Sequence, residues 1–273
     1  MKFKLLLSAV VATAAIATAL PASAAPIFPV YTVSPGAGEF GTLGTTFTAN
    51  DLGGQYNEKV TFTTATMFNV SLYFQGGQFA FDDTSSPPNA TYNAAQTGLG
   101  SNYGLYALFL GSGNYSTNSV TGATTFNLTS GNLSLVLDKN NDGTTVTAPL
   151  TGLMPYIVSS TVDDIQLGFG TGATGLGTSL GTTCGNNNCG SFGQSTPFTL
   201  TAAGKNFFPL PDPFYNLVLT SGQFQGINPL VGTTIQSSGT ANNVFARVPE
   251  PESLALFGVA LLGLAVTRRR KLV

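Results

Sequence analysis

Residues 69–75 read Asn-Val-Ser-Leu-Tyr-Phe-Gln, and residues 132–137 read Asn-Leu-Ser-Leu-Val-Leu. Apolar residues recur at every second position of both stretches, as in a β-strand that turns alternate side chains toward a core. No segment between residues 25 and 247 shows a capped helical pattern of useful length. The sequence therefore predicts an all-β fold: a single antiparallel sandwich or jelly-roll-like domain. Further β-branched or aromatic stretches lie at residues 61–68, 79–81, 105–110, 124–128, 165–169, 198–201, 214–220 and 243–246.

Clusters of Gly, Asn, Asp and Pro separate these stretches and indicate turns. Residues 129–132 predict a tight hairpin between two alternating runs, and residues 139–143 predict the next hairpin. Residues 168–193 are rich in Gly, Thr and Asn, which predicts a long mobile loop. No Pro-rich or charged linker divides the body, so we expect one domain over residues 25–247.

The composition indicates a chain that folds around a core and has an unusual surface. Charged residues make up 8% of the chain, whereas hydrophobic residues reach 42% and aromatic residues 11%. A disordered linker would lack this apolar content. The polar remainder is mostly Thr, Ser, Asn, Gln and Gly, whose hydroxyls and amides hydrogen-bond well to sugars and to other polar chains.

The charge of the body argues against a nucleic-acid partner. The chain has 12 acidic and 10 basic residues. Two of the acidic residues and six of the basic residues lie outside residues 25–247, so the body keeps ten acidic and four basic residues, a charge of about −6. The four bases are scattered along the body, so no basic patch is available for a phosphate backbone.

The first 24 residues have the pattern of a secretory signal peptide. Lys2 and Lys4 precede an apolar run over residues 5–20, and a small-residue cleavage site of the A-x-A kind follows. We expect signal peptidase to cut after Ala24, with Ala22 in the recognition site and Ala25 at the mature N-terminus. An uncleaved membrane helix is the alternative.

Residues 248–273 combine three signals in a fixed order. A helix-breaking polar entry is followed by an uncharged apolar run over residues 253–267 and then by a basic cluster. Because a dense positive cluster stays in the cytoplasm, the body should lie on the other side of the membrane. The entry consists of Val248, Pro249, Glu250 and Pro251, and the basic stop consists of Arg268, Arg269, Arg270 and Lys271.

This order resembles the PEP-CTERM sorting signal of Gram-negative bacteria, which an exosortase is thought to cut near the Pro-Glu-Pro. The resemblance implies export across the inner membrane, transient anchoring by the tail and a final place at the cell surface or in the extracellular matrix. The alternative is a permanent single-span anchor. Its apolar run of about fifteen residues is short against the roughly 20 that a bilayer requires.

The body also resembles flocculation-associated PEP-CTERM proteins, in which it would promote cell aggregation in association with exopolysaccharide. That resemblance implies a non-enzymatic matrix protein and supplies no catalytic residue. The stretches that carry it lie at residues 102–116, 133–143, 184–224 and 243–251.

The sequence contains few of the residues that catalysis usually requires. The chain contains no histidine, which excludes Ser-His-Asp and Cys-His arrangements and His-ligated metals. The adjacent pairs Asp82–Asp83 and Asp163–Asp164 would point to opposite faces of a strand, so we expect no enzyme. The alternative is a carbohydrate-binding module or a carbohydrate-active enzyme on a jelly-roll fold. A cluster of exposed aromatic side chains on one sheet face would support it, with Tyr73, Tyr103, Tyr106 and Tyr115 as candidates.

Cys184 and Cys189 are the only cysteines, and export makes a short disulfide between them the expected state. The chain-entropy contribution of so small a loop is about 2 kcal/mol, so the bridge should stiffen a loop rather than hold the fold.

Residues 138–143 fit the first half of a calcium loop of the D-x-[DN]-x-[DN]-G kind, with Asp138, Asn140 and Asp142 as oxygen ligands. The pattern departs at its twelfth position, where Pro149 replaces the bidentate Glu. A plain hairpin would have the same residues, so a calcium loop and a hairpin both remain open interpretations. We expect no cofactor other than calcium.

Overall fold

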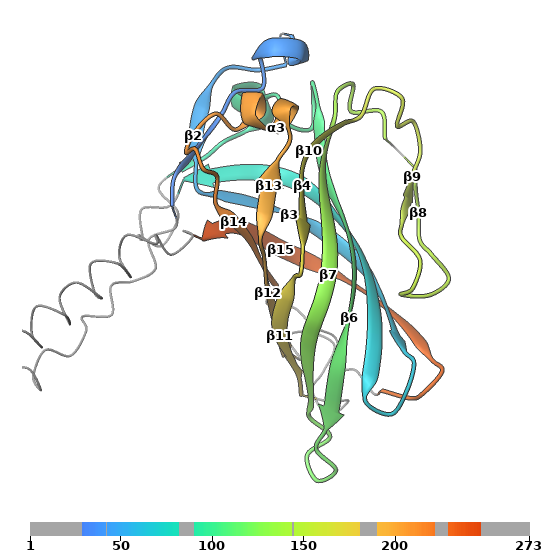
Figure 1. The fold of residues 1–273 in the computed structure, drawn as a ribbon. Helices are drawn as coiled ribbons and strands as arrows, with labels where there is room; N and C mark the ends of the chain where they lie inside the picture. The colour runs from blue at the N-terminus through green and yellow to red at the C-terminus, as the bar shows by residue number, and fades with distance from the viewer. Residues whose placement is uncertain are drawn as a thin grey trace, which may run out of the picture.

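The computed structural model describes residues 29–41, 43–81, 90–143, 145–180, 190–221 and 229–246, and strands dominate it (Figure 1). All strand pairs are antiparallel, which confirms the predicted all-β antiparallel class. Helices are confined to η1 (Gly38–Phe40), α2 (Ala94–Thr97) and α3 (Ala202–Phe207) in this part of the chain. The strands are β1 (Tyr31–Val33), β2 (Phe47–Ala49), β3 (Asp51–Phe62), β4 (Met67–Phe81), β5 (Ala90–Thr91), β6 (Gly104–Thr117), β7 (Thr124–Asp138), β8 (Val146–Thr147), β9 (Ile157–Val158), β10 (Ile165–Thr171), β11 (Thr174–Ser179), β12 (Gly190–Thr196), β13 (Phe198–Leu200), β14 (Asn216–Ser221) and β15 (Thr234–Ala246).

One large sheet curls until it closes on itself. Its strands run in the order β11-β12-β14-β15-β3-β4-β6-β7, and β11 pairs with β7 as well as with β12. These eight strands form a closed ring, and its opposite walls face each other across the core as the two sheets of a sandwich do. The strands β10 and β13 extend the sheet beyond β7 as a side branch.

Strand β7 both closes the ring and carries the side branch, because its two halves pair with two different strands. Its first half pairs with β11 from Thr124 to Leu128, and its second half pairs with β10 from Asn132 to Leu137. Between the halves the register against β6 shifts at Thr129, whose Oγ1 donates to the Ser112 carbonyl at 3.3 Å. Such a bulge bends a strand without ending it.

Three local predictions were wrong. Residues 129–132 form this bulge rather than a hairpin. The predicted strand at residues 61–68 spans the turn between β3 and β4, where the Thr63 amide donates to the Met67 carbonyl at 3.0 Å. The described part of the predicted mobile loop at residues 168–193 consists mainly of the end of β10, the strand β11 and the start of β12, which are paired with neighbouring strands. Residues 181–189 lie outside the described residues.

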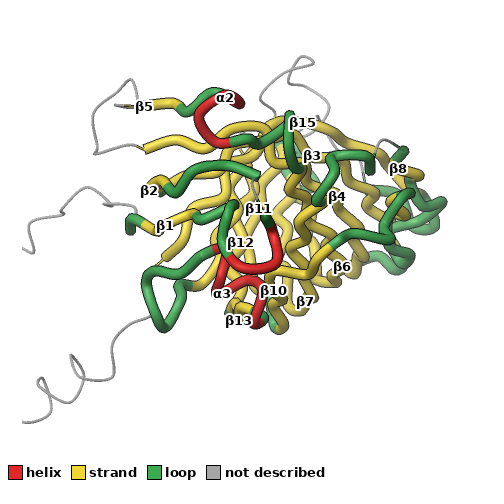
Figure 2. Tube along the Cα trace, turned by 90° about the horizontal axis from the view of Figure 1, so that it is seen from above, coloured by secondary structure: helices red, strands yellow, loops and turns green. Residues whose placement is uncertain are grey.

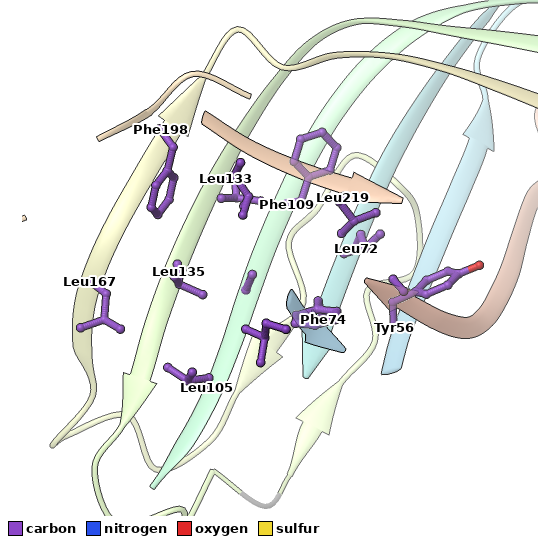
Figure 3. Packing of buried hydrophobic residues seen from close by; sticks show 14 of the residues in the cluster. Tyr56, Leu72, Phe74, Leu105, Phe109, Leu133, Leu135, Leu167, Phe198 and Leu219 are labelled. Atoms are coloured by element: carbon purple, nitrogen blue, oxygen red, sulfur yellow. The ribbon is translucent and has the colours of Figure 1, made fainter. Parts of the chain in front are cut away.

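The inner face of the ring is packed with aromatic and aliphatic side chains (Figure 3). Phe109 is 3% exposed and lies against the backbone of the cross-strand pair Gly111 and Gly131. A Cβ on Gly131 would lie 2.4 Å from Phe109 Cζ, so a side chain at position 131 would clash with the Phe109 side chain and glycine is required there. Leu72, Phe74, Leu105, Leu133, Leu135, Leu167, Phe198 and Leu219 belong to the same core and are labelled in Figure 3.

Residues 139–164 leave the ring after β7 and include the small β8–β9 pair. This excursion and the β1–β2 pair lie on opposite sides of the sheet in both views (Figures 1 and 2). Beneath the excursion a second, smaller apolar cluster forms on the outer face, consisting of Tyr73, Tyr106, Val136 and Tyr156. No helix in the described residues is long and apolar enough to cross a membrane. The predicted signal peptide and membrane helix lie outside those residues.

Candidate functional site

An acidic cluster lies where the chain leaves β7 and where it returns to β10. Asp138 ends β7, Asp142 follows on the turn, and Asp163 precedes β10. One carboxylate oxygen from each of the three lies within 4.8 Å of the others. The sequence pattern singled out Asp138 and Asp142, and the fold adds Asp163 from a distant segment. Asn140, the third predicted ligand, lies exposed on the turn between the first two.

The Asp138 carboxylate holds this turn together. The Asp138 side chain is buried, its Oδ1 accepts the Asp142 amide at 3.1 Å and its Oδ2 accepts the Gly143 amide at 2.8 Å. Asn141 adopts a left-handed conformation with φ of 54°, and its side-chain amide donates to the Gly100 carbonyl at 2.9 Å. A turn is therefore present at residues 139–143, but the predicted hairpin was wrong, because the chain leads into the excursion and the next strand, β8, pairs with β9 and not with β7.

Asp164 adds a fourth carboxylate, which Tyr106 anchors. The Tyr106 hydroxyl donates to Asp164 Oδ2 at 2.5 Å. Burial raises the pKa of Asp164, and so does the negative charge of Asp138, Asp163 and Asp142, while the bond from Tyr106 lowers it. One buried oxygen of Asp163 and one of Asp164 have no hydrogen-bond partner among the described residues. Burying two adjacent carboxylates whose oxygens lack hydrogen bonds costs free energy, unless a proton or a cation neutralises part of their charge.

The expectation that Asp163 and Asp164 are neighbours on a strand was wrong. They lie on a bend before β10 and not on a strand, so strand alternation does not separate them, and both join the same acidic neighbourhood. Sequence reasoning missed Asp163 because its partners lie some twenty residues upstream. Asp82 and Asp83 lie outside the described residues.

This oxygen-rich arrangement has the chemistry that a hard cation such as Ca²⁺ requires. Lys139 is the basic residue next to Asp138 in sequence, but its Nζ donates to the Glu39 carbonyl at 3.0 Å. Its ammonium group is thus engaged by a backbone carbonyl rather than by the acidic cluster. Asp163 can replace the missing twelfth ligand of the loop pattern, where Pro149 stands.

The four tyrosines considered as a sugar platform are buried. Tyr73, Tyr103, Tyr106 and Tyr115 are all less than a tenth exposed and pack in the two apolar clusters. Burial raises the pKa of Tyr73 to about 12, with a further contribution from Asp138 and Asp164. These rings stabilise the fold and are not available to stack on a ligand.

An open groove lies on the outer face beside the excursion and has a volume of about 280 Å³. Its floor follows a cross-strand row in which Asn69 pairs with Ser112 and Ser112 with Ser130; the two serine hydroxyls are 2.8 Å apart. In the next row Leu110 pairs with Asn132. None of its described lining residues is charged, and Asn69 and Asn132 add two side-chain amides to the lining.

The excursion forms one wall of this groove through Leu153, which is exposed. Gly152 fixes that wall, because its amide donates to Thr61 Oγ1 at 2.8 Å. A Cβ at Gly152 would lie 2.4 Å from the Asn69 carbonyl oxygen, so only glycine permits this approach. A groove that offers hydroxyls and amides without charge suits an uncharged polyhydroxylated ligand.

The remaining predicted site residues lie outside the described part of the chain. They are Ala22, Ala24 and Ala25 at the signal cleavage site, Cys184 and Cys189, and the tail residues from Val248 onward. The last described residue, Ala246 at the end of β15, pairs with Asn216 of β14. The predicted sorting tail therefore begins two residues after the last ring strand.

The tail defines the class of protein, an exported chain that carries a C-terminal processing signal. Residues 247–271 match the family model described as the PEP-CTERM protein-sorting motif. The match begins one residue before the start of the predicted tail and ends two residues before the end of that tail. This chain therefore carries a PEP-CTERM motif, which marks exported proteins that are transiently anchored in the membrane and sorted by an exosortase to the cell surface. No curated protein and no solved structure matches the chain.

Proposed function

We propose that this protein is a non-enzymatic component of the extracellular matrix that promotes cell aggregation in association with exopolysaccharide. The sorting motif at residues 247–271 carries the proposal, because it delivers the body to the place where cells and matrix meet. Signal peptidase removes residues 1–24 at the inner membrane of a Gram-negative bacterium, and an exosortase then acts near Pro249-Glu250-Pro251.

The groove beside the excursion supports the association with polysaccharide. Its volume is close to the lower bound of about 300 Å³ for small-molecule sites, enough for a short stretch of a sugar chain. Asn69, Asn132 and the two paired serines offer donors and acceptors without a charge that would select an ionic ligand. A polysaccharide repeats its unit, so weak single contacts add up along the chain.

The acidic cluster supports a role for calcium. A cation held by Asp138, Asp142 and Asp163 would fasten the end of β7 to the start of β10 and so fix the excursion that walls the groove. The acidic body, at about −6, would also associate more readily with anionic surfaces when divalent cations screen and bridge the charges.

A carbohydrate-binding module or a carbohydrate-active enzyme is the second candidate, and the groove is the observation that favours it. Hydrolysis would need two carboxylates about 5 to 9.5 Å apart across a bound sugar. The described carboxylates that gather are those of the acidic cluster, where Asp138 is already engaged by backbone amides. The groove itself offers no carboxylate among its described lining residues. These observations support binding over catalysis.

The decisive experiment compares flocculation of wild-type cells and of cells that lack this protein across a calcium series, with polysaccharide output measured in parallel. We expect poor flocs without the protein at unchanged polysaccharide output. Normal flocs in the deletion strain would refute the aggregation role. Reducing sugar released from polysaccharide by the purified chain would promote the enzymatic alternative.

A strain with Pro249→Ala and Pro251→Ala tests the sorting step separately. Removing both helix breakers should leave the tail uncut and the protein in the membrane fraction. Replacement of Pro87 and Pro88 by Ala is the matched control, because it removes two prolines from the body and leaves the motif intact. Equal release of all three proteins would contradict a role for the prolines in processing.

A further inference from the structure

A glutamate lies inside the ring among apolar side chains. Strand alternation turns Glu58 of β3 toward the core together with Tyr56 and Val60, and Glu58 is 4% exposed. Its cross-strand partners are Ser237 on β15 and Leu72 on β4. Glutamate is almost never fully buried without a partner, so this position requires an explanation.

The surroundings leave the carboxyl group poorly satisfied. Glu58 Oε1 and Ser237 Oγ are buried, and neither has a hydrogen-bond partner among the described residues. Glu58 borders an apolar cavity of about 20 Å³, which has room for a water molecule but not for a larger ligand. The other lining residues are Val60, Phe68, Val70, Leu72, Phe109, Phe126, Phe192 and Gln194.

No charged side chain on the described strands around this cavity faces the carboxyl group. Ser237 faces it from β15, Val70 and Leu72 from β4, and Gln194 from β12, while β6 and β7 contribute phenylalanines. Lys59, the adjacent residue, lies on the outer face by alternation. Burial raises the pKa of Tyr156 in the excursion to about 12, with a further contribution from the charge of Glu58.

We propose that Glu58 is a proton-binding site that makes the stability of the closed ring sensitive to pH. When the carboxyl group is protonated, the wall formed by β15, β3 and β4 closes over a neutral core. When it ionises, a charge without a counterion lies in an apolar cavity, and the cost of that charge favours opening of the wall. This property goes beyond the proposed role in aggregation and does not depend on it.

The direction of the effect follows from the titration of the folded and unfolded chains. Burial raises the pKa of Glu58 from 4.5 to about 7, and the nearby Ser237 offsets this only in part. Between these two values the folded state binds a proton that the unfolded state has released. Stability is therefore highest below pH 4.5 as far as this group is concerned, falls as the pH rises toward 7, and changes little above it.

The test is chemical unfolding of the full chain in a nonionic detergent between pH 5 and pH 8, for the wild type and for Glu58→Gln. The unfolding equilibrium constant of the wild type should rise about fortyfold from pH 5 to pH 7 relative to that of Glu58→Gln. Glu39→Gln is the matched control, because Glu39 is exposed; it should keep the wild-type dependence. Parallel curves for the wild type and Glu58→Gln would overturn the proposal.

A second measurement needs no variant that folds. The side-chain carboxyl carbons of the chain's four glutamates can be titrated by NMR in the wild-type protein. The carboxyl carbon of Glu58 should titrate near neutral pH. If all four titrate below pH 5, Glu58 is not a proton-binding site at neutral pH.

Discussion

The ring and the excursion over residues 139–164 solve different physical problems. The ring buries large apolar side chains on its inner face, and each of its strands is paired on both sides. The excursion has one short strand pair and exposes Leu150 and Val162. It is held to the ring by the small apolar cluster around Tyr156 and by a few polar contacts at its two ends and at Gly152. The difference teaches that stability resides in the ring, while the chemistry able to bind a cation or a sugar gathers where the excursion meets it.

Phe109→Ala should have the largest effect, because it empties the space beneath Gly111 and Gly131 inside the ring. We expect a loss of about 3–5 kcal/mol in the free energy of unfolding, measured with denaturant. Val120→Ala removes methyl groups from a residue that is 91% exposed and should change stability by less than about 0.5 kcal/mol. Equal losses would mean that the ring does not dominate stability.

Tyr106→Phe removes the hydroxyl that ties the excursion to the outer face through Asp164. The expected loss is about 1.5–3 kcal/mol, because the bond is to a charged group and Asp164 keeps a buried oxygen without a donor. Loss of this donor also raises the pKa of Asp164 further. Hydrogen exchange should quicken in residues 145–165 and not in β3 or β4, whereas Tyr92→Phe should leave both regions unchanged.

Reduction of the Cys184–Cys189 pair tests a segment at the junction of β11 and β12. The predicted bridge should contribute about 2 kcal/mol at most, so reduction should lower the melting temperature by only a few degrees. Mass spectrometry of the non-reduced peptide would detect the bridge directly. Two free thiols in protein prepared without reductant would contradict it.

Calcium should have the smallest effect of the four. With a dissociation constant near 1 mM, about 10 mM Ca²⁺ would stabilise the folded chain by about 1.4 kcal/mol. Asp142→Asn combined with Asp163→Asn should abolish this shift in melting temperature. Asp212→Asn, distant in sequence and exposed, should retain it. An unchanged shift in the double variant would show that calcium acts elsewhere.

Much of the fold follows from local pattern, since the alternation at Val70 to Phe74 and at Leu133 to Leu137 is a property of single strands. Closure of the ring does not follow from local pattern. It depends on one extra residue, Thr129, at the bulge where β7 changes its partner from β11 to β10. In the same way, the turn capped by Asp138 could be predicted from neighbouring residues in the sequence. Long-range strand pairing, which the sequence does not show, brings Asp163 to the acidic cluster and places Asn69 and Asn132 together in the groove. Glu58 was overlooked because a single charged residue in an alternating strand gives no sign of which face it occupies.

The place of β15 has a mechanical consequence. β15 is the last strand before the sorting tail, and it is bonded along β3 from Thr234 to Val244 and along β14 from Asn242 to Ala246. A pull directed along β15 from its C-terminal end would load many of these hydrogen bonds together instead of opening them one after another. While the tail holds the chain to the membrane, shear forces on the body are thus resisted by the most continuously paired part of the ring.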